Sequence, residues 1–117
     1  MGVSMGGLQA IETGIVHVGY FRWIGAFSPG VISGSFSEEF KKAISNPNKL
    51  NEDLHLFDIV TGDKDEMVGK YISEFEAQLK EAQVRHVYTV IPSGTHSMFV
   101  WRPALCSFLE QIFKRGV

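Results

Sequence analysis

The chain has 117 residues, of which 44% are hydrophobic, and its formal net charge is −2. These values predict one domain with a buried core, and the interspersed charges argue against nucleic acid or an anionic membrane as a partner. The single cysteine, Cys106, excludes an internal disulfide framework and a cysteine-based zinc site. We expect no metal and no cofactor. The sequence shows no apolar run long enough to span a membrane and no signal peptide.

Hydrophobic periodicity and turn residues divide the chain into alternating helices and strands. Apolar residues at helical spacing predict four helices, and runs rich in β-branched and aromatic residues predict three strands. In chain order these are a helix at 5–18, a strand at 22–28, a helix after the capping box at 35–38, a strand at 54–61, a helix at 68–82, a strand at 85–91 and a helix at 105–112.

Two prolines are placed at helix ends. Asn46-Pro47-Asn48 is predicted to end the second helix, and Pro103 to lie in the first turn of the last helix. Strands that alternate with helices imply right-handed crossovers, so we predict an α/β fold with a three-stranded parallel sheet and flanking helices. The strand at 22–28 is expected to have a bare edge, which is a template for pairing with another chain.

The first seven residues contain a pattern that points to chemistry. Gly2-Val3-Ser4-Met5-Gly6 matches the Gly-x-Ser-x-Gly nucleophile elbow, a sharp turn from a strand into a helix with the serine at its tip. A Cβ at Gly2 or at Gly6 is expected to hit the neighbouring backbone. The pattern alone is weak, and the chain leaves no room for a full strand before it.

Further polar residues follow the later strands. Asp63 and Asp65 come after the strand at 54–61, and His96 comes after the strand at 85–91. Because the carboxyl ends of parallel strands meet at one edge of a sheet, these side chains are expected to lie near Ser4. The order serine, acid, histidine is that of a hydrolase catalytic triad.

The chemistry explains the residue types. A serine hydroxyl needs a base within hydrogen-bond reach, neutral imidazole can take and return the proton, and a buried carboxylate fixes the imidazole tautomer. The backbone amide of Met5, at the start of the helix, is the expected oxyanion donor.

Each candidate also has an alternative interpretation as a purely structural residue. Ser4 is then a helix N-cap, and one of the two aspartates caps the following helix. Three side chains after His96 line either an acyl or aromatic pocket or the core: Met98, Phe99 and Trp101. The remaining histidines are expected to be structural or solvated and the cysteine to pack in the core: His17, His55, His86 and Cys106.

The segments Ser-Met-Gly-Gly-Leu-Gln-Ala and Phe-Arg-Trp-Ile-Gly-Ala-Phe-Ser resemble the esterase D-like esterases, a group that includes feruloyl, acetyl-xylan and enterochelin esterases. Thr61-Gly62-Asp63-Lys64-Asp65 resembles the acid loop of that family. Gly94-Thr95-His96-Ser97 and Val100-Trp101-Arg102-Pro103 resemble its histidine loop and last helix.

The resemblance implies a truncated α/β-hydrolase fold, corresponding to the C-terminal half of the family domain and spanning 1–117. It implies Ser4 as nucleophile, His96 as base and Asp65 as acid, with Asp63 as the competitor. The implied activity is hydrolysis of a small-molecule ester, feruloyl or short acyl, through an acyl-enzyme. The alternatives are an acyltransferase with the same triad and a catalytically silent fragment or interaction module. We also expect a homo-oligomer that covers the edge at 22–28.

Overall fold

Four parallel strands form one sheet whose spatial order, β1-β2-β3-β4, follows the chain order. The structure is a computed structural model and describes residues 1–32 and 36–115. The predicted α/β class with a parallel sheet and flanking helices is confirmed. The elements are β1 (Gly2–Val3), α1 (Met5–Val16), β2 (Trp23–Phe27), α2 (Glu38–Ile44), α3 (Pro47–Asp53), β3 (Leu56–Gly62), α4 (Gly69–Glu81), β4 (Val87–Ile91) and α5 (Met98–Arg115).

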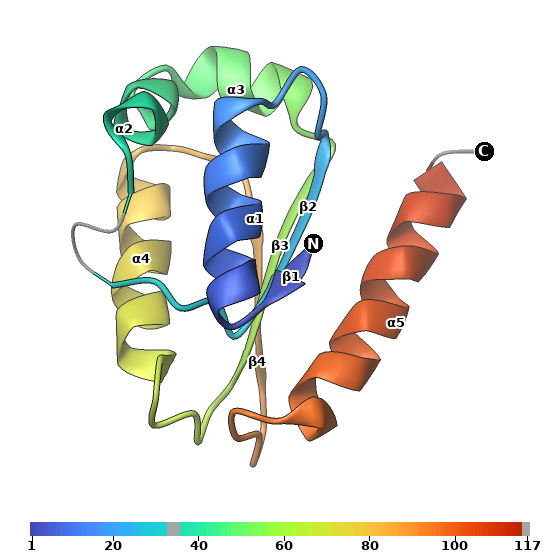
Figure 1. The fold of residues 1–117 in the computed structure, drawn as a ribbon. Helices are drawn as coiled ribbons and strands as arrows, with labels where there is room; N and C mark the ends of the chain where they lie inside the picture. The colour runs from blue at the N-terminus through green and yellow to red at the C-terminus, as the bar shows by residue number, and fades with distance from the viewer. Residues whose placement is uncertain (33–35, 116–117) are drawn as a thin grey trace.

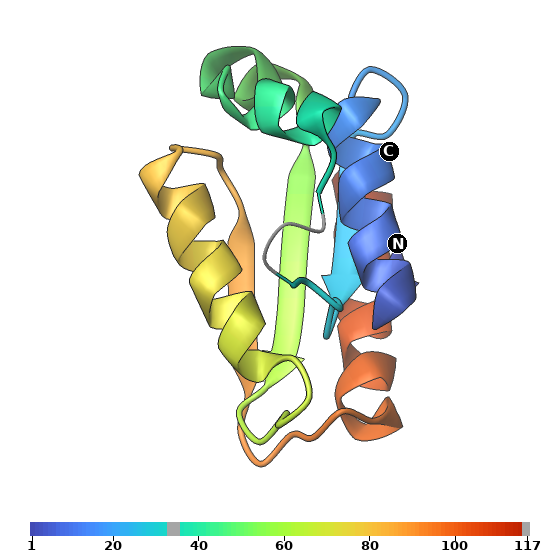
Figure 2. The same cartoon turned by 60° about the vertical axis from the view of Figure 1, so that its left-hand side comes forward.

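Helices lie on both faces of the sheet (Figure 1), and a hydrophobic layer fills the space on each face. One layer packs the inner sides of α1, α2, α3 and α4 against one face of the sheet, with Ile11, Ile59 and Ile72 fully buried. The other layer packs α5 alone against the opposite face, centred on Val100 and Phe108. Figure 2 shows α1 and α4 on the same face of the sheet, with β3 visible between them. Because successive side chains of a strand alternate between faces, β3 contributes residues to both layers.

The sheet has four strands, so the predicted number of three is wrong. The additional strand is β1, where Gly2 and Val3 pair with Ala26 and Phe27 of β2. Two residues are too few for any periodic signal to predict a strand. The edge of β2 is therefore covered at its carboxyl end, where Ser4 lies, while β1 pairs with none of the residues 23–25.

The helix predicted to end at Asn46-Pro47-Asn48 does end there, since α2 stops at Ile44. A further helix, α3, was not predicted: it starts at Pro47, where a missing N–H costs nothing. The predicted place of Pro103 in the first turn of the last helix is wrong. Pro103 lies inside α5, which begins earlier than expected, at Met98. Part of the predicted capping box, Ser35, lies outside the described residues. The cap of α2 is Ser37, whose Oγ accepts a hydrogen bond from the Phe40 amide at 3.1 Å.

The glycines around Ser4 differ in what surrounds them. A Cβ on Gly2 would lie 2.0 Å from the carbonyl oxygen of Gly6, and a Cβ on Gly7 would lie 2.9 Å from Cα of Pro29. A Cβ on Gly6 would meet nothing within 4 Å, so the crowding expected at Gly6 is wrong. The close approaches that need glycine are at Gly2, against the backbone of Gly6, and at Gly7, where α1 passes the chain leaving β2.

One carboxyl group is buried under α5. Asp58 of β3 lies on the same face of the strand as Leu56 and Val60, which pack against α5, and it is only 3% exposed. Burial raises its pKa from 3.8 to about 6. Within the described residues, no helix combines the length and apolar character that a membrane crossing requires.

Candidate active site

Ser4 occupies a strained turn between β1 and α1. Its backbone angles, φ 54° and ψ −120°, lie in a region that residues other than glycine rarely adopt. The turn is held by backbone hydrogen bonds: the Ser4 amide donates to the Phe27 carbonyl at 3.0 Å, and the Ser4 carbonyl accepts from Gly30 at 2.8 Å. The Ser4 side chain makes no capping hydrogen bond to α1. The hydroxyl is thereby aimed away from the helix.

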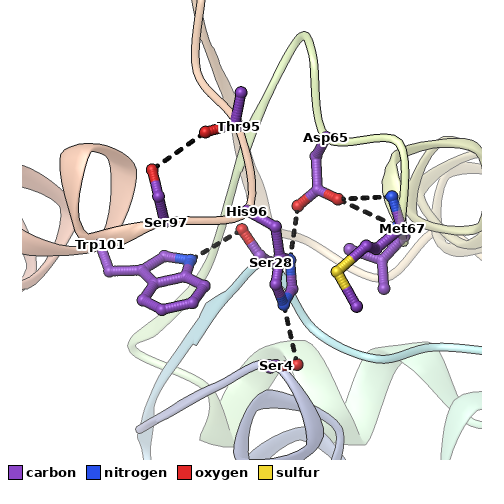
Figure 3. Close-up of polar contacts among 9 residues, drawn as sticks. Ser4, Ser28, Asp65, Met67, Thr95, His96, Ser97 and Trp101 are labelled. Atoms are coloured by element: carbon purple, nitrogen blue, oxygen red, sulfur yellow. Dashed lines mark hydrogen bonds and ion pairs between the residues drawn. The ribbon is translucent and has the colours of Figure 1, made fainter.

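The loop after β4 brings His96 to this hydroxyl. His96 Nε2 lies 3.0 Å from Ser4 Oγ, and His96 Nδ1 lies 2.8 Å from Oδ2 of Asp65 (Figure 3). The imidazole side chain is 14% exposed and the Asp65 side chain is fully buried. Three residues predicted from separate loops therefore form one hydrogen-bonded chain at the carboxyl edge of the sheet.

These contacts select one tautomer of the neutral imidazole. An ionised carboxylate has no proton to donate, so the hydrogen bond to Asp65 requires the proton on Nδ1 of His96. Nε2 is then an acceptor, and the Ser4 hydroxyl donates to it. This is the arrangement in which imidazole can remove the hydroxyl proton.

Asp65 also organises its own loop. Its second oxygen, Oδ1, accepts hydrogen bonds from the amides of Met67 and Val68, both at 3.0 Å. Asp63, by contrast, is exposed, and its backbone amide donates to Ile91 at 3.0 Å. Of the two aspartates, only Asp65 contacts His96, and it also supplies the turn before α4.

The Met5 amide is placed at the start of α1, directly after Ser4. Within the part of the chain that the structure describes, this N–H donates no hydrogen bond. It is available to an oxygen beside Ser4, and the positive end of the helix dipole lies at the same position. The Met5 side chain is 59% exposed.

The three expected pocket residues have different surroundings. Met98 and Trp101 line a mainly apolar cavity of about 290 Å³, together with Val3, Phe27 and Leu105 among others. Phe99 is 65% exposed and is not part of this cavity lining. Trp101 is half-buried and also packs against the α5 layer.

One site residue was not predicted from the sequence. Ser28, which follows β2, is fully buried, and its Oγ accepts a hydrogen bond from Nε1 of Trp101 at 2.9 Å. The ring of Trp101 in turn meets the ring of His96 edge-to-face, with centroids 5.1 Å apart at 90°. The residues are far apart in sequence, and no motif links Ser28 to Trp101.

The other candidate groups lie elsewhere. The His86 ring bonds Glu76 at 3.0 Å and the Val84 carbonyl at 2.8 Å. His17 and His55 are exposed. Cys106 is exposed as well, so its predicted packing role is wrong. Among the described residues, no group of three or more His, Cys, Asp or Glu side chains is arranged to hold a metal ion.

Comparison with known proteins identifies the fold. No protein-family model matches the chain. It superposes on a ferulic acid esterase with a TM-score of 0.68 and 23% identity, covering 91% of this chain and 47% of the esterase. It also superposes on the CE1 ferulic acid esterase AmCE1/Fae1A from the anaerobic fungus Anaeromyces mucronatus, with a TM-score of 0.69 and 21% identity, covering 92% of this chain and 40% of that one. The chain thus spans less than half the length of these esterases and has part of their fold.

Proposed function

We propose that this chain is a serine carboxylic-ester hydrolase that works through an acyl-enzyme. The observation that supports this most strongly is the hydrogen-bonded chain from Ser4 through His96 to the buried Asp65. The strained backbone of Ser4 at the start of a helix adds to it, because such a turn exposes a nucleophile next to an amide donor.

In the proposed reaction, Nε2 of His96 takes the Ser4 hydroxyl proton as Oγ bonds to the ester carbonyl carbon. The carbonyl oxygen becomes an oxyanion and accepts a hydrogen bond from the Met5 amide. When the ester C–O bond breaks, His96 gives its proton to the leaving alcohol, and the acyl group stays on Ser4. A water molecule, deprotonated by His96, then attacks the acyl carbon, the bond to Ser4 Oγ breaks as His96 returns the proton to Oγ, and the carboxylic acid leaves. Throughout, Asp65 keeps the imidazole oriented and stabilises the imidazolium.

The proposed substrates are feruloyl or short acyl esters. The sequence resemblance and the fold shared with ferulic acid esterases support this class. The apolar cavity of about 290 Å³ bounded by Met98 and Trp101 is large enough for a small acyl or aromatic group.

The competing hypothesis is a catalytically silent interaction module. It is favoured by the coverage, since the matched esterases are more than twice as long as the aligned part. Hydrolysis of short-chain p-nitrophenyl esters by wild type and Ser4→Ala separates the two. We expect Ser4→Ala to lower the rate at least about a thousand-fold, with Ser73→Ala, an exposed serine on α4, as the unaffected control.

A fluorophosphonate probe gives a second reading of the same site. Mass spectrometry is expected to find the label on Ser4 of the wild type. A folded wild type that neither hydrolyses these esters nor takes the label would reject the esterase in favour of the silent module. Transfer of the acyl group to an added alcohol in preference to water would instead indicate an acyltransferase.

We also propose that the chain forms a homo-oligomer through the β1–β2 edge. Met1 lines two hollows, of about 340 and 290 Å³, and Phe21, which lines the larger one, is 49% exposed. Apolar surface of this kind favours association. Sedimentation is expected to show a dimer or larger species, which Phe21→Glu weakens. A folded wild-type monomer at micromolar concentration would contradict this proposal.

A further inference from the structure

The imidazole of His96 is bounded on one side by an aromatic ring with a fixed position. The rings of Trp101 and His96 stand at 90° with centroids 5.1 Å apart. Trp101 lies in the first turns of α5, five positions after His96, and its neighbour Val100 is fully buried under the sheet. This turn of the helix is thus anchored in the core rather than at the surface.

The indole is also held from a second element. Its Nε1–H donates to Oγ of Ser28 at 2.9 Å (Figure 3). Ser28 is fully buried, its φ is 47°, and its amide donates to the Val60 carbonyl at 2.7 Å. A hydroxyl on such a constrained backbone has little freedom, so the hydrogen bond fixes the indole relative to the carboxyl end of β2.

We propose that Trp101, tethered by Ser28, is the positioning residue that keeps the imidazole of His96 between Asp65 and Ser4. The inference rests on the proposed esterase function. The ring is hydrogen-bonded to Asp65 at Nδ1 and to Ser4 at Nε2, and the bond to Ser4 is lost when Oγ attacks the substrate. The single remaining bond, to Asp65, then leaves the ring able to turn about its side-chain torsions. The perpendicular indole occupies the space into which the ring would turn. Ser28 thereby fixes the position of the imidazole relative to β2. The same strand also holds the Ser4 turn through Phe27.

Three variants separate the contribution of the Trp101 ring from that of its hydrogen bond to Ser28. Trp101→Leu removes the ring and the tether, Trp101→Phe keeps an aromatic ring without the N–H, and Ser28→Ala removes only the acceptor. We expect Trp101→Leu to lower kcat by about 10- to 100-fold, because misplacing a catalytic group acts on the transition state. Trp101 also bounds the proposed acyl cavity, so the KM comparison rests on Ser28→Ala, which lies outside the cavity lining and is expected to change KM less than about twofold. Trp101→Phe and Ser28→Ala are expected to lose about tenfold each. The double variant Ser28→Ala/Trp101→Phe is expected to be no worse than either, since both break the same hydrogen bond.

The matched control is Phe113→Leu, another aromatic residue of α5, which is 68% exposed and away from the site. It is expected to keep wild-type kcat and KM. Thermal unfolding of each variant identifies any that fails to fold, and Ser28→Ala and Trp101→Phe are the milder changes that keep the test decisive.

A measurement without substrate distinguishes failure of this inference from failure of the esterase proposal. The Nδ1 proton of His96, hydrogen-bonded to Asp65, is expected to give a far-downfield NMR signal that Asp65→Asn abolishes. We expect the signal to persist in Phe113→Leu and to broaden in Trp101→Leu and Ser28→Ala. An unchanged signal in those two folded variants, or its absence from the wild type, would overturn the positioning role. A normal signal in a wild type that hydrolyses nothing would overturn the esterase and leave the positioning role standing.

Discussion

Gly62 and Gly94 touch backbone to backbone. A Cβ on Gly62 would lie 2.2 Å from the carbonyl oxygen of Gly94. The same two loops are joined by a hydrogen bond from the Lys64 amide to that carbonyl at 2.8 Å. The loop that carries Asp65 and the loop that carries His96 are therefore closer together than a side chain at Gly62 would allow. This contact holds Asp65 within hydrogen-bond distance of His96.

We predict that Gly62→Ala separates these loops. Backbone cannot yield as a flexible side chain does, so we expect a loss of about 1–3 kcal/mol in unfolding free energy, together with a marked loss of ester hydrolysis. Urea unfolding and p-nitrophenyl ester assays measure both. Gly19→Ala is the control, since a Cβ there meets nothing within 4 Å. Equal stability and activity for the two variants would contradict the prediction.

The glycines of the Ser4 turn give a second matched pair. Gly2→Ala places a Cβ 2.0 Å from the Gly6 carbonyl oxygen and is expected to distort the turn and abolish fluorophosphonate labelling of Ser4. Gly6→Ala meets nothing within 4 Å and lies in α1, so it is expected to keep labelling and to gain up to about 1 kcal/mol from helix propensity. Normal labelling of Gly2→Ala would show that the turn adapts.

The two aspartates are predicted to differ sharply. In Asp65→Asn, the amide oxygen can still accept from Met67 and Val68, but the amide NH₂ then faces Nδ1 of His96. The imidazole must place its proton on Nε2 and can no longer accept from Ser4. We expect kcat to fall by about 10²–10⁴-fold with little change in stability.

Asp63→Asn is the control for this substitution. Its side chain is exposed, and we expect wild-type kinetics. Steady-state assays of both variants, with circular dichroism to check folding, decide the assignment. A large loss in Asp63→Asn alone would transfer the acid role to that residue.

Asp58 predicts a pH dependence of stability. Because burial raises its pKa from 3.8 to about 6, the folded chain binds this proton more tightly than the unfolded chain. Its contribution to stability is present below about pH 4 and is lost as the pH rises towards 6, by roughly 2–3 kcal/mol. The stability difference between wild type and Asp58→Asn, measured by urea unfolding from pH 4 to 7, isolates this group. A difference that stays constant over that range would contradict the prediction.

Elements with a long apolar face were predictable from the sequence. The core helix with Ile72 and Leu79 follows from its helical periodicity, and the buried strand around Ile59 follows from its continuous run of strand-favouring residues. The start of α3 at Pro47 was not predictable, because a proline that follows the end of one helix can equally begin another. The two-residue strand β1 depends on pairing with β2, which local sequence does not encode.

For the candidate site, the positions of Ser4, Asp65 and His96 follow from one rule, that parallel strands end at the same edge. The choice between the two aspartates followed from the family resemblance, while the distances that favour Asp65 come from the fold. The link between Ser28 and Trp101 spans 73 positions and joins two ordinary side chains, so only the folded chain reveals it.

The hydroxyl of Ser4 and the imidazole of His96 are separated by 92 positions, nearly the full length of the chain. During synthesis Ser4 emerges before His96, which follows all four strands. A partly made chain that lacks the last loop cannot form the hydrogen bond between them. Under the proposed function, reaction of Ser4 with an active-site probe therefore reports completed folding, and it can be used on nascent or refolding chains to time the closure of the whole sheet.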